Sequence, residues 1–317
     1  MKSGSMTTGS SSVRQPPYAV LLAAYGSPRN ADEVPAYLSD VRGGRATPPA
    51  VVEELRHRYA AIGGASPLLA RSQSQARGLA SRLDHGTPVY LGMRHWHPYI
   101  ADVMAEIRRE GHQRIVAVPL APHFSRLSIG AYAAAFDAAR ATTEVRLVGA
   151  WFDHPAFLDA VAARVREALE RFPEAARGEV ALGFTAHSLP RRILSEQDPY
   201  PDQLQASVDG VLSRLGPRPA RLAYQSAGRT DEPWLGPDVS DLVRELAGEG
   251  VRNVLICPIG FVSDHLEVLY DIDIELQALA ESLGLRLERT ESLNDHPLLL
   301  EALAARVREA ARQAGWA

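Results

Sequence analysis

Three carboxylates in residues 258–275, PIGFVSDHLEVLYDIDIE, have the spacing of a shared chemical site. Glu267, Asp271 and Glu275 stand at i, i+4 and i+8, so in a helix their side chains lie along one face. Like charges at this spacing destabilise a helix by about 0.2–0.5 kcal/mol per pair, so such acids usually hold a cation or pass protons. The residues between them are nearly all apolar, which predicts a buried acidic stripe rather than a solvated helix face.

A histidine provides the second candidate group. The segment TAHSLP places His187 just after an apolar stretch that reads as a strand. An isolated histidine is more often structural than catalytic, but imidazole with carboxylate is a ligand set for a borderline divalent metal. Imidazole also accepts a proton with an ordinary pKa near 6.5. Tyr25 follows the first apolar stretch, and taken alone it reads as a half-buried aromatic residue.

Strands are needed to position these residues. Short apolar segments alternate with amphipathic helical segments, which is typical of parallel sheets covered on both faces. The predicted strands are residues 18–25, 88–93, 114–120, 145–151, 180–186, 221–226, 253–259 and 285–290. Ligands bind outside the carboxyl ends of such strands. The candidate residues at those ends are Tyr25, 94–97, 123–125, His187, Gln225 and 264–267.

An internal repeat predicts two halves rather than one barrel. Residues 97–120 match residues 236–259 at a constant offset of 139, with Pro98 on Pro237, Gly111 on Gly250 and Pro119 on Pro258. Each copy reads as a helix that ends at glycine and is followed by a strand. We expect a disordered tail over 1–16, an N-terminal half over 17–165 and a C-terminal half over 166–317. The last helix is expected to be able to pack back on the first half.

The composition excludes several functional classes. The chain has 317 residues, 46% hydrophobic and 23% charged, with a net charge of −4, so it offers no basic surface for nucleic acid. Its one cysteine, Cys257, excludes internal disulfides and iron–sulfur clusters held by this chain. Without an apolar segment long enough to span a membrane, or a signal peptide, a cytoplasmic protein is expected. Dinucleotide-binding and Walker motifs are absent.

A set of matched segments carries a family resemblance. In chain order they are LLAAYGSP, RYAAIGGASPL, VPLAPHFSRLSIGAY, TAHSLP, DPYPDQL, AYQSAGRTDEPWLGPDV and GFVSDHLEVLYDIDIE. The chain resembles the ferrochelatases, and is most like the coproporphyrin III ferrochelatases of Gram-positive-type bacteria. The resemblance implies an α/β chelatase fold: two Rossmann-like halves, each a four-stranded parallel sheet flanked by helices, with a porphyrin cleft between them.

The resemblance also implies an activity and its substrates. The expected reaction is a lyase reaction of haem biosynthesis, in which Fe2+ is inserted into coproporphyrin III to give coproheme. Fe2+ is then a substrate, and no cofactor is required. A coproheme decarboxylase is the candidate partner that would take the product, and no stable membrane anchor is expected.

Individual residues match positions of the family pattern. His187 and Glu267 match the catalytic, metal-handling pair, and Asp271 and Glu275 match an acidic path for protons or metal. The positions that match contacts to the macrocycle or its carboxylates are Tyr25, Arg42, Arg58, Tyr59, Ser66 and Tyr132.

Three alternatives stay open from the sequence alone. The substrate could be protoporphyrin IX, or the protein could be a cobalt or nickel chelatase of the same fold. The third alternative is a non-enzymatic tetrapyrrole carrier, which would bind a porphyrin without turning it over. The acidic segment DHLEVLYDIDIE argues against a cobalt or nickel chelatase, because those enzymes tend to place more histidines at the metal.

Overall fold

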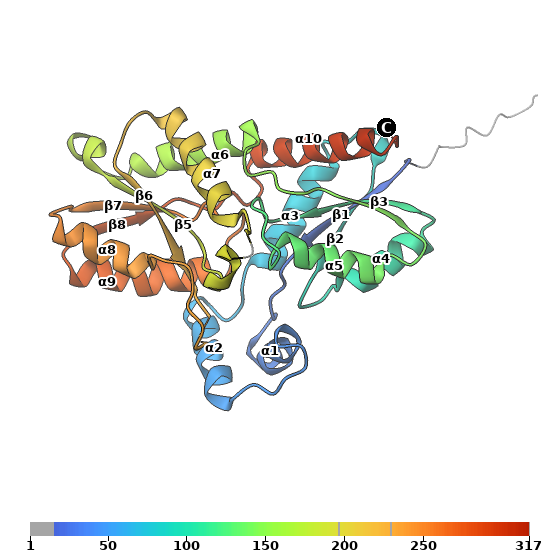
Figure 1. Cartoon of the computed structure of the whole chain (residues 1–317), viewed down its shortest axis with the longest axis horizontal. Coiled ribbons are helices and arrows are strands. Elements are labelled where there is room, and N and C mark those ends of the chain that lie inside the picture. The colour runs from blue at the N-terminus through green and yellow to red at the C-terminus, as the bar shows by residue number, and fades with distance from the viewer. Residues whose placement is uncertain (1–15, 196, 229, 317) are drawn as a thin grey trace, which may run out of the picture.

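The protein folds as two four-stranded parallel sheets, each covered by helices (Figure 1). The computed structural model describes residues 16–195, 197–228 and 230–316, so the predicted tail over 1–16 lies almost wholly outside the described residues. The sheet orders are β2-β1-β3-β4 and β6-β5-β7-β8. The strands are β1 Ala19–Ala24, β2 Val89–Met93, β3 Arg114–Pro119, β4 Glu144–Leu147, β5 Ala181–His187, β6 Ala220–Gln225, β7 Asn253–Cys257 and β8 Arg286–Arg289. The predicted fold class is confirmed.

One strand differs from its prediction. The expected strand over 145–151 ends at Leu147 in β4. Beyond it the chain turns inward, and the Trp151 side chain becomes fully buried with its indole N–H donating to the Pro119 carbonyl at 3.3 Å. The apolar residues that suggested a longer strand therefore fill the core from a loop.

Helices cover both sheets and join the two halves. The first sheet is covered by α3 Leu68–Ala80, α4 Ile100–Arg109 and α5 Ile129–Ala139, and the second half contains α7 Tyr200–Leu215, α8 Val239–Gly248 and α9 Gln277–Ser282. The chain passes between the halves in α6 Pro155–Leu169, which packs against the last helix, α10 Pro297–Gln313. This last helix also contacts α3 and β3, so it lies against the first half (Figure 1). No described helix has the length and apolar character needed to cross a membrane.

The sequence repeat is visible as a repeated strand–helix–strand unit. The buried residues of α4 are Ile100, Val103, Met104 and Ile107, and those of α8 are Val239, Leu242, Val243 and Leu246, at the same 139-residue offset. This i, i+3, i+4, i+7 spacing puts the apolar side chains of each helix on its sheet.

Strand register shows which residues of the two halves are equivalent. Val118 pairs with Leu22, and Cys257, which lies 139 residues after Val118, pairs with Phe184, so Leu22 and Phe184 are equivalent. Three residues further along each strand, Tyr25 is therefore equivalent to His187. In the same way, Ala24 pairs with Met93 and Ala186 pairs with Tyr224, so the next residues, Arg94 and Gln225, are equivalent.

The second copy contains an insertion. Met93 lies five residues before Pro98, whereas Tyr224 lies thirteen before Pro237, which leaves eight extra residues in the second half. The longer loop carries Trp234, which lines a cavity described below.

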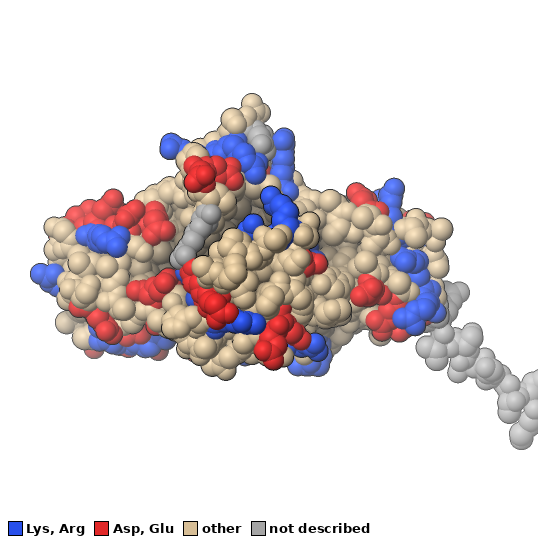
Figure 2. All heavy atoms as spheres, turned by 90° about the horizontal axis from the view of Figure 1, so that it is seen from below, with Lys and Arg blue, Asp and Glu red and all other residues tan. Residues whose placement is uncertain are grey.

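A small lobe stands apart from both sheets. It consists of α1 Val34–Val41 and α2 Pro49–Ala61, inserted between β1 and α3 (Figure 1). Both helices begin with proline in the first turn, where the missing N–H costs no hydrogen bond. Seen from the side of the lobe, the surface is hollowed, and acidic and basic side chains both occur around the hollow (Figure 2).

Candidate functional site

A cavity of about 580 Å³ lies where the two halves and the lobe meet. Its walls include the carboxyl ends of β1, β2, β3 and β5, which is where ligands bind in sheets of this kind. Six of the predicted site residues line it: Tyr25, Tyr59, Ser66, Tyr132, His187 and Glu267. The other four, Arg42, Arg58, Asp271 and Glu275, do not line this cavity.

At the second-half side of the cavity, Glu267 lies between two imidazoles. One carboxylate oxygen is 3.5 Å from Nε2 of His187 and the other is 3.5 Å from Nε2 of His265. Nδ1 of His187 contacts the Ser188 carbonyl, and Nδ1 of His265 is 2.9 Å from the Ser263 carbonyl. Because a carbonyl only accepts, both Nδ1 atoms carry hydrogen, and both Nε2 atoms are presented to the carboxylate.

The charges of this group stabilise one another. Burial disfavours the charged imidazole of His187, but the Glu267 carboxylate outweighs it and raises the pKa of His187 to about 9. Burial likewise opposes ionisation of Glu267, yet His187 and then His265 lower its pKa well below the ordinary range. At neutral pH the resting site therefore holds an imidazolium beside a carboxylate. A group of this kind can exchange a bound proton for a metal cation.

His265 was not among the residues predicted as catalytic. It falls within 264–267, which the strand-end argument marked as a candidate range, but only the folded structure aims its ring at Glu267. The missed signal is its position two residues before Glu267 in the segment DHLE.

The acidic stripe is wound as a π-helix, Val268–Leu276, rather than as an ordinary α-helix. Such wide turns occur mainly as short segments and often at functional sites. The prediction that the whole acidic stripe is buried is wrong. The exposed fraction of the side chain is 11% for Asp271 and 52% for Glu275. The three acids thus run from the cavity wall at Glu267 through a buried carboxylate to the surface.

Arg58 of the lobe contacts this stripe. Its guanidinium lies 3.1 Å from Asp271 and 3.9 Å from Glu275, and over the ring of Tyr270. The Ser226 hydroxyl donates to the other oxygen of Asp271 at 2.5 Å. In this structure Arg58 joins the lobe to the second half, and a contact between Arg58 and a substrate carboxylate stays a prediction. Arg42 caps the end of α1, and its role also stays a prediction.

Asp271→Asn should stabilise the fold at neutral pH. Burial, aided by the charge of Glu267 and opposed by Ser226 and Arg58, raises the pKa of Asp271 to about 6. The folded pKa exceeds the unfolded one, so this group's contribution to stability is complete below about pH 4 and is lost as pH rises through about 6. We expect the variant to gain on the order of 2–3 kcal/mol in unfolding free energy at pH 7.5 and about half of that at pH 5.

Chemical denaturation at the two pH values measures this gain. Asp241→Asn, on the exposed face of α8, is the control and should change little at either pH. An unchanged or less stable Asp271→Asn protein at pH 7.5 would contradict the buried-carboxylate interpretation.

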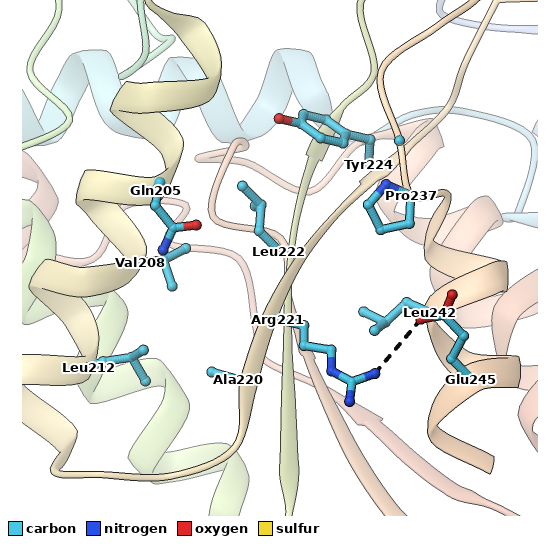
Figure 3. A pocket seen from close by; sticks show the side chains of 11 residues that line it. Gln205, Val208, Leu212, Ala220, Arg221, Leu222, Tyr224, Pro237, Leu242 and Glu245 are labelled. Atoms are coloured by element: carbon cyan, nitrogen blue, oxygen red, sulfur yellow. Dashed lines mark ion pairs between the residues drawn. The ribbon is translucent and has the colours of Figure 1, made fainter. Parts of the chain in front are cut away.

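A second hollow, of about 450 Å³, lies along the edge strand β6 between α7 and α8 (Figure 3). Its charged lining residues, Arg221 and Glu245, pair with each other at 3.8 Å. Without an imidazole or an unpaired charge in its lining, this hollow is a weaker candidate for metal chemistry than the cavity at His187.

Comparison with known proteins decides the family. The family model described as Ferrochelatase matches residues 17–311. The chain is 46% identical over 293 residues to a ferrochelatase of Herpetosiphon aurantiacus, covering 90% of this chain and 96% of that one. The chain belongs to the ferrochelatase family. It is therefore a lyase that inserts a metal into a porphyrin. A further relative of this ferrochelatase, 39% identical over 90% of this chain and 93% of its own, is the coproporphyrin III ferrochelatase of Geobacillus kaustophilus.

Two solved structures have the same fold as this chain. SirB from Bacillus subtilis with Fe3+ aligns with a TM-score of 0.62, covering 94% of this chain and 97% of that chain, at 13% sequence identity. CbiX, described as the terminal enzyme of siroheme biosynthesis in denitrifying bacteria, aligns with a TM-score of 0.53 at 13% identity. At such low identity these likenesses show the chelatase fold alone. The sequence relatives place the chain among ferrochelatases rather than among cobalt or nickel chelatases.

Proposed function

We propose that this ferrochelatase inserts Fe2+ into coproporphyrin III to give coproheme. The observation that carries the proposal is a cavity with a His–Glu–His group on one side and many hydrogen-bond donors on the others. The donors in its lining include Ser27, Tyr59, Ser66, Arg94 and Ser128. Buried carboxylates need such donors, and coproporphyrin III carries four carboxylates. The names of several relatives at 37–39% identity support the same substrate.

The chemistry follows from the charges of the site. Metal insertion removes two N–H protons from the porphyrin and places one divalent cation on its four nitrogens. The carboxylate of Glu267 and a deprotonated Nε2 of His187 provide acceptors for those protons and hold the incoming cation beside the macrocycle. From Glu267 the protons pass toward solvent along Asp271 and Glu275, whose exposure increases in that order.

The walls of the cavity can bend the macrocycle, which metal insertion also requires. A free porphyrin is nearly planar, so its nitrogen lone pairs are poorly presented to a metal. Contacts along the rim of the macrocycle can hold it in a bent shape, and binding energy from the carboxylates then lowers the barrier to insertion. This gives the donors a role in turnover as well as in affinity.

A direct comparison of substrates tests the proposal. We expect kcat/KM for coproporphyrin III to exceed that for protoporphyrin IX by at least about tenfold, which corresponds to about 1.4 kcal/mol of transition-state binding. Both porphyrins are assayed anaerobically with Fe2+ in the same non-ionic detergent, so that aggregation of protoporphyrin does not imitate specificity. Equal or faster turnover of protoporphyrin IX would reject the substrate while leaving the ferrochelatase assignment in place.

A further inference from the structure

Arg94 lies at the carboxyl end of β2, where the backbone is held in place. Its amide donates to the Ala24 carbonyl at 2.9 Å, and the amide of His95 donates to the Tyr25 carbonyl at 2.8 Å. These two bonds continue the pairing of β1 with β2 past the last strand residue. The Arg94 side chain therefore starts from a fixed point, and it lines the cavity.

Two aromatic rings flank the guanidinium of Arg94. Its central carbon lies 5.9 Å from the ring centroid of Tyr25 and 5.9 Å from that of Tyr132. Tyr132 is itself buried, with 5% of its surface exposed, so it forms a firm support. An aromatic ring attracts a guanidinium without offering it an oxygen acceptor, so the N–H groups of Arg94 stay available for a hydrogen-bonding ligand.

No carboxylate among the described residues pairs with the Arg94 guanidinium. Among the residues that the structure describes, none forms an ion pair or a side-chain hydrogen bond with the Arg94 guanidinium. The neighbouring acid, Asp40, is engaged with Nδ1 of His95 at 2.8 Å. Other partly buried arginines, such as Arg58 and Arg289, do have carboxylate partners. Arg94 is thus a supported, unpaired cation on the wall of a cavity.

The equivalent residue of the second half has a different task. Gln225 accepts a hydrogen bond from the Thr185 hydroxyl at 2.7 Å, and its amide donates to the Glu267 carbonyl at 3.3 Å. That residue is 1% exposed and supports the backbone of the metal-handling side. The first half has a cation at this register position, and no described residue gives its guanidinium a comparable hydrogen bond.

We propose that Arg94 binds a carboxylate of the tetrapyrrole through its N–H edge and so helps to determine substrate specificity. The inference rests on the proposed function, because it requires a carboxylate-bearing porphyrin in this cavity. A guanidinium and a carboxylate form two parallel hydrogen bonds, which is the strongest pairing available to an uncovered arginine edge. Lysine can supply the charge at this position but only a single point of contact.

Binding without metal tests the inference. Arg94→Met and Arg94→Lys are titrated against coproporphyrin III and against its tetramethyl ester in the same non-ionic detergent, with porphyrin fluorescence as the readout. We expect Arg94→Met to weaken binding of the acid at least about tenfold, as for loss of a charged hydrogen bond, and to change binding of the ester less than about twofold. Arg94→Lys should lie between Arg94→Met and the unmodified protein. In turnover, kcat/KM for coproporphyrin III should fall at least about tenfold.

Arg109→Met, on the exposed end of α4, is the matched loss of one positive charge and should bind both porphyrins normally. Equal weakening for acid and ester would show that Arg94 is only part of the wall, and undiminished binding of the acid would show that it contacts no carboxylate; either result overturns the proposal. If Arg94→Met fails to fold, Arg94→Gln replaces it. The acid–ester comparison uses one macrocycle, so its outcome does not depend on whether coproporphyrin or protoporphyrin is turned over faster.

Discussion

His187→Ala should abolish metal insertion while the protein still folds and binds porphyrin. The variant removes the Nε2 atom that faces Glu267 at 3.5 Å, and with it one candidate metal ligand and proton acceptor. Loss of a general base typically reduces a rate by about 10²–10⁴-fold, and loss of a metal contact adds to this. The ring lies on the cavity wall, so porphyrin contacts elsewhere in the cavity are retained.

Anaerobic turnover with Fe2+ measures the loss, and fluorescence titration of the porphyrin measures binding. His112→Ala, in the turn between α4 and β3, removes a histidine far from the cavity lining and should behave as the unmodified protein. Retention of more than about a tenth of the original turnover by His187→Ala would remove this residue from the mechanism.

Glu267→Gln should cause a comparable loss and should also change how the rate depends on pH. The Glu267 carboxylate raises the pKa of His187 to about 9, so the imidazole is protonated at neutral pH. A protonated imidazole neither binds a metal nor accepts a proton, so in the unmodified protein kcat/KM should rise as pH increases toward 9. Without the carboxylate charge, burial dominates and the pKa of His187 falls toward or below its ordinary value near 6.5.

The acid limb of the kcat/KM profile should therefore move to lower pH by at least about one unit in Glu267→Gln, on top of a rate loss of about 100-fold or more. Profiles from pH 6 to 9, taken with Zn2+ as the inserted ion, avoid oxidation of iron. Glu275→Gln, at the exposed end of the stripe, should lose less than about tenfold and keep the limb in place. An acid limb that stays at the same pH in Glu267→Gln would contradict the inference that the Glu267 carboxylate raises the pKa of His187.

The strands and their ends were predictable because the signals are local. Apolar segments bounded by proline and glycine mark β1, β3 and β7, and the rule that ligands bind at carboxyl ends then selects His187 and Glu267. The spacing of Glu267, Asp271 and Glu275 was likewise readable, although not that the middle carboxylate is the buried one.

Other features depend on tertiary structure. The π-helical winding of Val268–Leu276 is a change of hydrogen-bond register that an apolar pattern does not encode. The contact of Arg58 with Asp271 joins residues 213 positions apart, and the contact of Arg94 with Tyr132 joins the end of β2 to α5 of the same half. Each of these depends on how the lobe and the helices pack, which no local segment of the chain determines.

The equivalence of Tyr25 and His187 in strand register has a stereochemical consequence. Two identical halves would present the same group to both sides of a flat ligand, whereas here β1 ends in a phenol and β5 in an imidazole. The two faces of the proposed substrate, coproporphyrin III, are mirror images of each other, and an enclosure with unlike sides distinguishes them. We expect the ring to be loaded in one handed orientation, with a single prochiral face toward His187. In the proposed reaction we therefore expect iron to enter every product molecule through that same face.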